Sequence, residues 1–132
     1  MLVGIPVAVV ALLVVADVAD QVRGCGSVDP TDPANYSAVA ILNDTSGAVV
    51  IDECPGAYCQ AGKLPVRVAP GGRFSDDAAC GASGTDMTSW RVTGSARKLI
   101  GYIAVDTPRK HDGLVFHVSR ASPDRHTPTP PG

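Results

Sequence analysis

SAVAILNDTSGAVVIDEC, at residues 37–54, is the stretch that decides the fold class of this 132-residue chain. Two runs of small and β-branched residues, 37–42 and 48–54, flank the polar segment Asn-Asp-Thr-Ser-Gly at 43–47. Val and Ile are enriched in strands, whereas Asn, Asp, Ser and Gly are enriched in turns. The stretch therefore predicts two strands, and we expect them to pair as a β-hairpin.

Further short runs with strand patterns follow, and turn residues separate them. They cover residues 64–69, 73–80, 87–93, 99–105 and 114–119. In the first of these runs Leu64, Val66 and Val68 alternate with other residues, so we expect these three on the inner face of a sheet. Pro65 cannot donate a backbone hydrogen bond, which predicts that this strand lies at a sheet edge.

The last three runs supply most of the expected core. Trp90 is the largest apolar side chain among them, and we expect it to anchor the core. Residues 99–105 are apolar on both faces, which predicts a central strand that is covered on both sides. Residues 114–119 alternate, so the apolar side chains there would point inward and His117 would point outward.

Seven short strands with no amphipathic helix between them indicate an all-β protein. We expect an antiparallel immunoglobulin-like β-sandwich over residues 37–121. A small barrel is the alternative. Residues 122–132 contain four prolines among polar residues, which predicts a disordered and exposed tail.

An apolar segment precedes this domain and indicates export. Residues 2–16 carry no charge, but they are fewer than the roughly 20 apolar residues that cross a bilayer. Residues 1–22 therefore predict a signal peptide or an uncleaved signal-anchor helix, and residues 23–36 form a linker. A signal peptide usually has basic residues before its apolar segment, and none is present here. A true start codon upstream of Met1 is the hypothesis that would account for this. The alternatives to a signal peptide or signal anchor are a lipoprotein signal at Cys25 and a buried core helix.

The chain contains four cysteines, at positions 25, 54, 59 and 80, and an even number in a short exported chain favours disulfides. Cys54 and Cys59 flank a turn-like Pro-Gly-Ala-Tyr segment, so we expect them to form a bridge across a hairpin mouth. Cys25 and Cys80 stay unassigned, because the sequence is compatible with several pairings of Cys80 and with none.

The positions of the histidines argue against a metal site. Zinc would need a second close pair of ligands near Cys54 and Cys59, and the histidines at 111, 117 and 126 lie far downstream. A blue-copper site needs two histidines with its cysteine, but no histidine precedes Cys80 or lies between it and Met87. We therefore expect neither a metal nor another cofactor.

Several segments carry a family resemblance. They are the run from Val49 through the cysteine pair, VRVAPGG at 66–72, Cys80, DMTSW at 86–90 and GYIAVDTPRKHDG at 101–113. Together they resemble small exported or membrane-attached proteins of actinobacteria that carry no assigned function. The resemblance covers most of residues 37–128 and implies a β-rich fold outside the cytoplasm. It implies no activity, cofactor or site residue.

The densest cluster of polar residues joins the last two strands and is the candidate binding site. It comprises Asp106, Arg109, Lys110, His111 and Asp112. Loops on a rigid β scaffold often carry binding groups, and a histidine beside an acid titrates near neutral pH. The alternative is a solvated loop whose proline and glycine set the turn geometry.

No complete catalytic constellation is visible in the sequence. Ser83 lies in a Gly-rich segment that does not match the Gly-x-Ser-x-Gly nucleophile elbow. The 11 basic and 13 acidic residues are scattered, which argues against a nucleic-acid partner.

We therefore expect a non-enzymatic envelope module, membrane-anchored through residues 2–22 or secreted, that binds a protein or a wall component. The alternative is a small enzyme or metal-dependent factor that uses residues 106–112 with His117 or His126. Convergence of these side chains in one pocket would favour the alternative.

Overall fold

The computed structural model describes residues 35–54, 59, 64–80, 87–107 and 113–132. Each of the seven runs expected from the sequence contains a strand, and the described residues include no α-helix. The strands are β1 (Tyr36–Leu42), β2 (Val49–Glu53), β3 (Val66–Val68), β4 (Arg73–Ala79), β5 (Thr88–Thr93), β6 (Leu99–Val105) and β7 (Leu114–His117). Two short 3₁₀ turns, η3 (Ser95–Arg97) and η4 (Val118–Arg120), follow β5 and β7.

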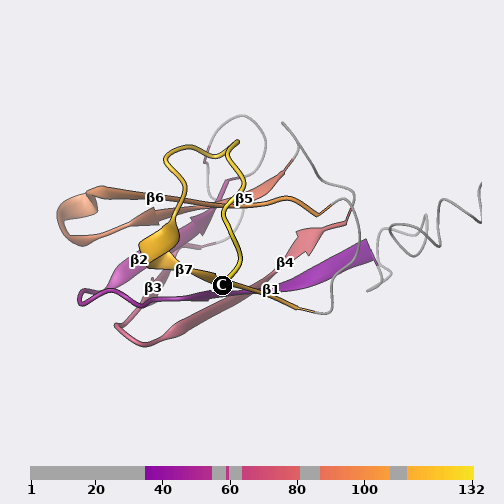
Figure 1. Ribbon diagram of the computed structural model, residues 1–132. Coiled ribbons are helices and arrows are strands. Elements are labelled where there is room, and N and C mark those ends of the chain that lie inside the picture. Colours follow the sequence, from indigo (N-terminus) through magenta and orange to yellow (C-terminus); the bar gives the residue numbers. More distant parts are fainter. Residues whose placement is uncertain (1–34, 55–58, 60–63, 81–86, 108–112) are drawn as a thin grey trace, which may run out of the picture.

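The strands form two separate sheets, which lie as two layers (Figure 1). One sheet has the order β4-β1-β7 and the other has the order β3-β2-β5-β6. Their facing sides share one hydrophobic core, so the described fold is a β-sandwich. The prediction of an all-β sandwich is confirmed.

Alternation along the strands builds this core, because successive side chains of a strand point to opposite faces. Trp90 is fully buried at its centre, as expected. Its ring meets the ring of Phe74 edge-on at 6.4 Å between centroids, and its Nε1–H donates to Asp76 Oδ2 at 3.0 Å. Both partners belong to β4, so Trp90 joins the two sheets. The other large members of the core are Val39, Ile41, Val49, Ile51, Val68, Val92, Ile103, Val105, Phe116 and Val118.

The predicted hairpin between the first two strands is wrong. β1 pairs with β4 and β7, whereas β2 pairs with β3 and β5, so the connection at 43–48 crosses between the sheets. Asn43 holds this connection in place. Its buried amide donates to the carbonyl oxygens of Gly47 at 2.9 Å and Val68 at 3.0 Å, and its Oδ1 accepts from Thr45. The side chain thus joins the connection to β3 and satisfies backbone groups there.

The immunoglobulin-like part of the fold prediction does not match the strand order. A constant-type immunoglobulin sandwich places its first, second, fourth and fifth strands in one sheet. Here the first, fourth and seventh strands share a sheet. In addition, β1 and β7 pair in parallel, which departs from the fully antiparallel prediction.

β3 confirms the predicted edge strand, because it pairs only with β2 among the described strands. It is short, and its side chains contribute less to the core than expected. Val68 is buried, but Val66 is 43% exposed and Leu64, which precedes the strand, is 87% exposed. An exposed edge with a proline beside it resists pairing with other chains.

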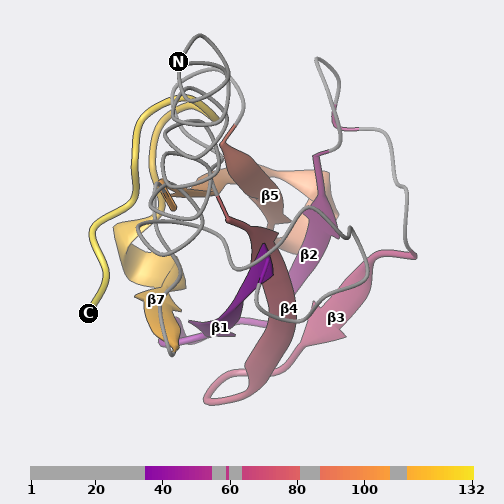
Figure 2. The same ribbon diagram turned by 90° about the vertical axis from the view of Figure 1, so that its right-hand side faces the viewer.

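The C-terminal segment is the largest correction. Residues 122–132 were expected to be disordered, but they run along the side of the sandwich that carries β6 and β7 (Figure 2). Ser122 exchanges two backbone hydrogen bonds with Tyr102, at 2.6 and 2.9 Å. Thr129 is buried, donates its backbone N–H to Ala104 O at 2.8 Å and accepts from Ala104 N through its hydroxyl at 2.9 Å.

The prediction that residues 99–105 form a central strand covered on both sides is wrong. β6 ends the described order β3-β2-β5-β6, and Leu99 and Ile100 at its start are 48% and 41% exposed. Ser122 and Thr129 bond to the outer backbone edge of β6 instead of another full strand. Gly101 permits the contact, because a Cβ at this position would lie 2.7 Å from Ser122 O. A glycine inside a strand often marks such a close backbone approach.

The predicted N-terminal segment, 1–22, and the linker up to residue 34 lie outside the described residues. Within the part of the chain that the structure describes, no helix is long and apolar enough to span a membrane.

Candidate functional site

The loop that the sequence singled out is only partly described. Asp106 is exposed, and Arg109, Lys110, His111 and Asp112 lie outside the described residues. The loop begins at a fixed point, because Thr107 is fully buried and its hydroxyl donates to Ala79 O at 2.6 Å. Thr107 therefore ties the end of β6 to the end of β4.

His117 does not lie at the end of β7 where this loop arrives. The loop enters β7 at Leu114, whereas His117 is the last residue of the strand and pairs with Leu42 of β1. Its Nδ1 lies 3.5 Å from Asp44 Oδ2, and its side chain is 29% exposed. The prediction that His117 is outward is consistent with this exposure. The strand thus separates it from the candidate loop.

Asp44 is the centre of the polar group around His117. Its carboxylate accepts a hydrogen bond from the Ser119 hydroxyl and another from Ser119 N at 2.8 Å. These two hydrogen bonds, with a smaller contribution from His117, hold the pKa of Asp44 below its usual range. Because Ser119 bonds to the carboxylate and not to the imidazole, this group is not arranged as a Ser-His-Asp catalytic triad.

His126 belongs to a third place on the surface. It is exposed, and its backbone N–H donates to Asp124 Oδ1 at 2.8 Å in a local turn. This bond, together with the Thr127 hydroxyl, lowers the pKa of Asp124. Within the described ranges, no three His, Cys, Asp or Glu side chains gather as a metal-binding group. The described residues of the predicted enzyme site, Asp106, His117 and His126, therefore do not converge on one place.

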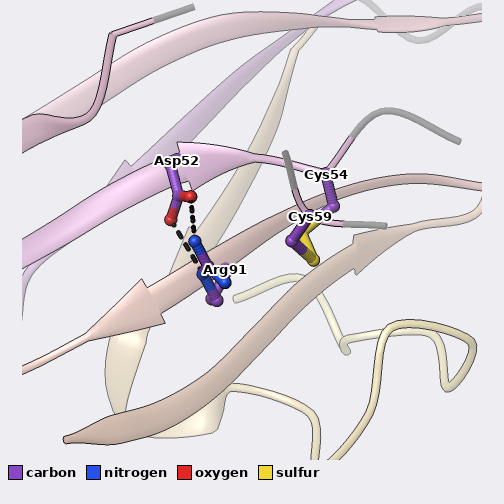
Figure 3. The surroundings of a disulfide bond; sticks show 4 residues. All are labelled: Asp52, Cys54, Cys59 and Arg91. Atoms are coloured by element: carbon purple, nitrogen blue, oxygen red, sulfur yellow. Dashed lines mark hydrogen bonds and ion pairs between the residues drawn. A yellow bond between two sulfur atoms is a disulfide. The ribbon is translucent and has the colours of Figure 1, made fainter. Parts of the chain in front are cut away.

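The structure instead points to the outer face of the four-stranded sheet, which carries a partly buried ion pair that sequence analysis missed. Asp52 on β2 and Arg91 on β5 are cross-strand partners (Figure 3). Arg91 Nε–H donates to Asp52 Oδ1 at 3.2 Å, and Nη2–H donates to Oδ2 at 2.6 Å. The Asp52 side chain is 5% exposed and that of Arg91 is 38% exposed.

This bidentate geometry makes Arg91 a fixed cation. The hydrogen bonds to Asp52 are the main reason why the pKa of Arg91 is raised above its usual range. A charge-assisted pair of parallel N–H···O bonds also holds the guanidinium in one plane. Asp52 and Arg91 therefore hold each other in a fixed position on this face.

The turn between β5 and β6 has an unusual backbone beside this ion pair. Ala96 and Arg97 have φ angles of 55° and 57°, in the left-handed region that non-glycine residues seldom adopt. The turn is closed by hydrogen bonds from Gly94 N to Lys98 O at 2.7 Å and from Lys98 N to Ser95 O at 3.2 Å. Two consecutive left-handed residues form the type I′ hairpin turn, which Asn-Gly would occupy at lower cost. Such strain often accompanies binding sites.

Two adjoining hollows lie around this turn, and we call them the outer-face hollows. One has a volume of about 500 Å³ and the other about 620 Å³, and they share Val50, Gly94 and Leu99. Both volumes fall in the range of small-ligand sites. Their charged lining, among the described residues, comprises the basic side chains Arg67, Arg91, Arg97 and Lys98 and a single carboxylate, Asp52.

A partial signal for this face was present in the sequence. Val50 and Asp52 alternate with buried Val49 and Ile51, so a polar residue at 52 indicates an outward position. The pairing of Asp52 with Arg91 was not predictable locally, because 39 residues separate them.

The disulfide predicted between Cys54 and Cys59 is confirmed, with Cα atoms 3.8 Å apart. Cys54 directly follows β2, two residues beyond Asp52, and closes part of the connection to β3 (Figure 3). Cys80, which the sequence left unassigned, is also disulfide-bonded. Cys25 lies outside the described residues.

Comparison with known proteins adds no functional information. No protein-family model, curated protein or solved structure matches the chain. The candidate site therefore depends on the geometry above.

Proposed function

We propose that this chain is a non-enzymatic binding module of the cell envelope, and that its binding surface is the outer face of the four-stranded sheet. The observation that carries the proposal is the pair of adjoining hollows beside a pre-positioned Arg91 and a strained turn. Concave sites with a few fixed polar groups on a rigid scaffold are typical of ligand binding.

The location outside the cytoplasm has separate support. The Cys54–Cys59 disulfide is typical of proteins that fold in an oxidising compartment. The apolar segment 2–16 and the resemblance to exported actinobacterial proteins agree with this location. We propose that the domain is either anchored in the membrane through residues 2–22 or secreted.

A photo-crosslinking amino acid at Tyr102, which lines the larger hollow, tests the binding surface in cells that naturally make the protein. The same amino acid at Arg120, exposed in η4 beyond the other sheet, is the matched control. We expect a discrete adduct at position 102 that is absent at position 120. No adduct at 102, or equal adducts at both positions, would reject this face as the binding surface.

Cell fractionation tests the location independently. We expect the chain in the membrane or the culture medium, with Cys54 and Cys59 oxidised. A cytosolic chain with reduced cysteines would contradict the envelope assignment.

A further inference from the structure

The lining of the outer-face hollows indicates the class of partner, and this inference rests on the proposed function. We propose that the hollows bind an acidic peptide segment of a protein partner, one that carries both carboxylates and apolar side chains. The charge of the hollows, their apolar wall and their shape all favour such a partner.

The charge on this face is unbalanced. Asp52 is the only carboxylate that lines either hollow in the described part of the chain, and Arg91 already neutralises it. Arg67, Arg97 and Lys98 form no ion pair with another described residue. The two hollows are therefore lined by three exposed cations in addition to the neutralised Asp52–Arg91 pair, and complementary negative charge on a partner would be attracted and oriented there.

The wall between these cations is apolar. Leu99 and Ile100 are 48% and 41% exposed, although both lie in a strand that is otherwise mostly buried. With Val50 they line the smaller hollow. An exposed apolar patch rimmed by polar groups is typical of an interaction site. A highly charged polymer without apolar groups would leave this wall unused, so the lining favours a peptide that carries both kinds of side chain.

The shape of the surface suits an extended segment. The two hollows share the lining residues Val50, Gly94 and Leu99, and together their linings reach from the β1–β2 connection to Tyr102. Arg97 of η3 lines the larger hollow, and Lys98, which directly follows η3, lines the smaller one. The hydrogen bonds from Gly94 N to Lys98 O and from Lys98 N to Ser95 O hold this basic turn in place, which reduces the entropy lost on binding.

Binding of a defined peptide by the 132-residue chain tests the inference. The probe is a fluorescein-labelled octapeptide of alternating glutamate and leucine with blocked ends, followed by fluorescence polarisation. Two matched peptides replace every glutamate with lysine or every leucine with serine. We expect binding of the glutamate–leucine peptide that weakens as salt rises above about 0.15 M, and much weaker binding of both matched peptides.

Charge reversal on the turn gives the decisive comparison. The double variant Arg97→Glu, Lys98→Glu should bind the glutamate–leucine peptide at least about tenfold more weakly, a loss of about 1.4 kcal/mol. Arg120→Glu makes a single reversal outside the hollows and should leave the affinity unchanged. Circular dichroism checks that each variant is folded. Equal affinities of the double variant and the native chain, or no binding of the peptide, would overturn the inference.

Anionic lipid is the competing source of negative charge. Vesicles of phosphatidylglycerol and phosphatidylcholine are therefore added to the same variants. If vesicle binding depends on Arg97 and Lys98 but peptide binding does not, the peptide assignment is overturned. The in-cell adduct at Tyr102 tests the binding surface and the class of partner separately. A non-protein adduct at Tyr102 rejects the peptide and keeps the binding surface, whereas the absence of any adduct rejects both.

Discussion

The inner and outer faces of the four-stranded sheet are made from alternate residues of the same strands, but they differ in chemistry. On the inner face, Ile51, Trp90 and Ile103 are fully buried and pack against the other sheet. On the outer face, Asp52 and Arg91 form a partly buried ion pair beside open hollows. The inner face stabilises the fold by excluding water, whereas the outer face carries exposed charges and open hollows, where we propose that a partner binds.

The largest expected effect comes from breaking the inner face at Trp90. Trp90→Ala removes a fully buried indole and its hydrogen bond to Asp76, and should lower the free energy of unfolding by about 4 kcal/mol. That loss approaches the whole stability of a small domain. Trp90 is the only tryptophan of the chain, so its variants lack a tryptophan fluorescence signal. Unfolding in urea is therefore followed by far-UV circular dichroism. Trp90→Phe keeps a ring near Phe74 and should cost about 2 kcal/mol. A loss below about 1 kcal/mol for Trp90→Ala would contradict the anchoring role.

The ion pair of the outer face should respond asymmetrically. Arg91→Ala leaves the nearly buried Asp52 carboxylate without its partner and should cost about 3 kcal/mol. Asp52→Ala leaves Arg91, whose side chain is 38% exposed and can be hydrated, and should cost about 1 kcal/mol. Urea unfolding of both variants measures the difference. Arg67→Ala, an exposed cation on the same face, serves as the control and should change stability by less than about 0.5 kcal/mol. Equal costs for the two ion-pair variants would argue against a buried carboxylate.

The turn beside the hollows should become more stable when its strain is relieved. Ala96→Gly removes the Cβ that disfavours a φ of 55°, and should raise the free energy of unfolding by about 0.5–1 kcal/mol. Ala79→Gly, in a strand and without positive φ, should instead destabilise the protein by a similar amount. Thermal unfolding compares the two variants. Destabilisation by Ala96→Gly would show that the left-handed backbone is not the source of strain.

The smallest effect is expected at Asp44, in the connection between the sheets and away from both faces. Its pKa is lowered in the folded protein, so its contribution to stability is present above the unfolded value, about 3.9, and is lost as the pH falls through the folded value. The side chain is 34% exposed, and solvent screening keeps the contribution small. The stability difference between the native chain and Asp44→Asn should be constant near neutral pH and shrink below about pH 4. Ser119→Ala should reproduce part of the change. A difference that does not depend on pH would contradict the assignment.

Part of the fold followed from local sequence. Alternation and β-branched residues placed every described strand, and the large apolar side chain of Trp90 within a predicted strand identified the core anchor. The spacing of Cys54 and Cys59 around a turn predicted their bridge. These features depend on residues that lie within a few positions of one another, so the sequence carries them directly.

The candidate site was less accessible to sequence reasoning. The polar cluster at 106–112 attracted attention because its residues are adjacent in the chain, and among them only Asp106 and Thr107 lie in the described part. The outer-face hollows combine residues of β2, β3, β5 and β6 with the turn after β5 and the connections before β2 and β3. Each of these strands contributes at most three lining residues, and no short window of sequence contains the set.

The sequence by itself determined which segments are strands, which faces are apolar and which cysteines can close a local loop. The tertiary structure decided which strands are partners: it placed β1 and β2 in different sheets, paired β1 with β7 in parallel, and laid the proline-rich end of the chain along β6. The physical reason is the range of the interactions. Side-chain alternation has a period of two residues, whereas backbone pairing is satisfied by any strand of suitable shape, however far along the chain it lies.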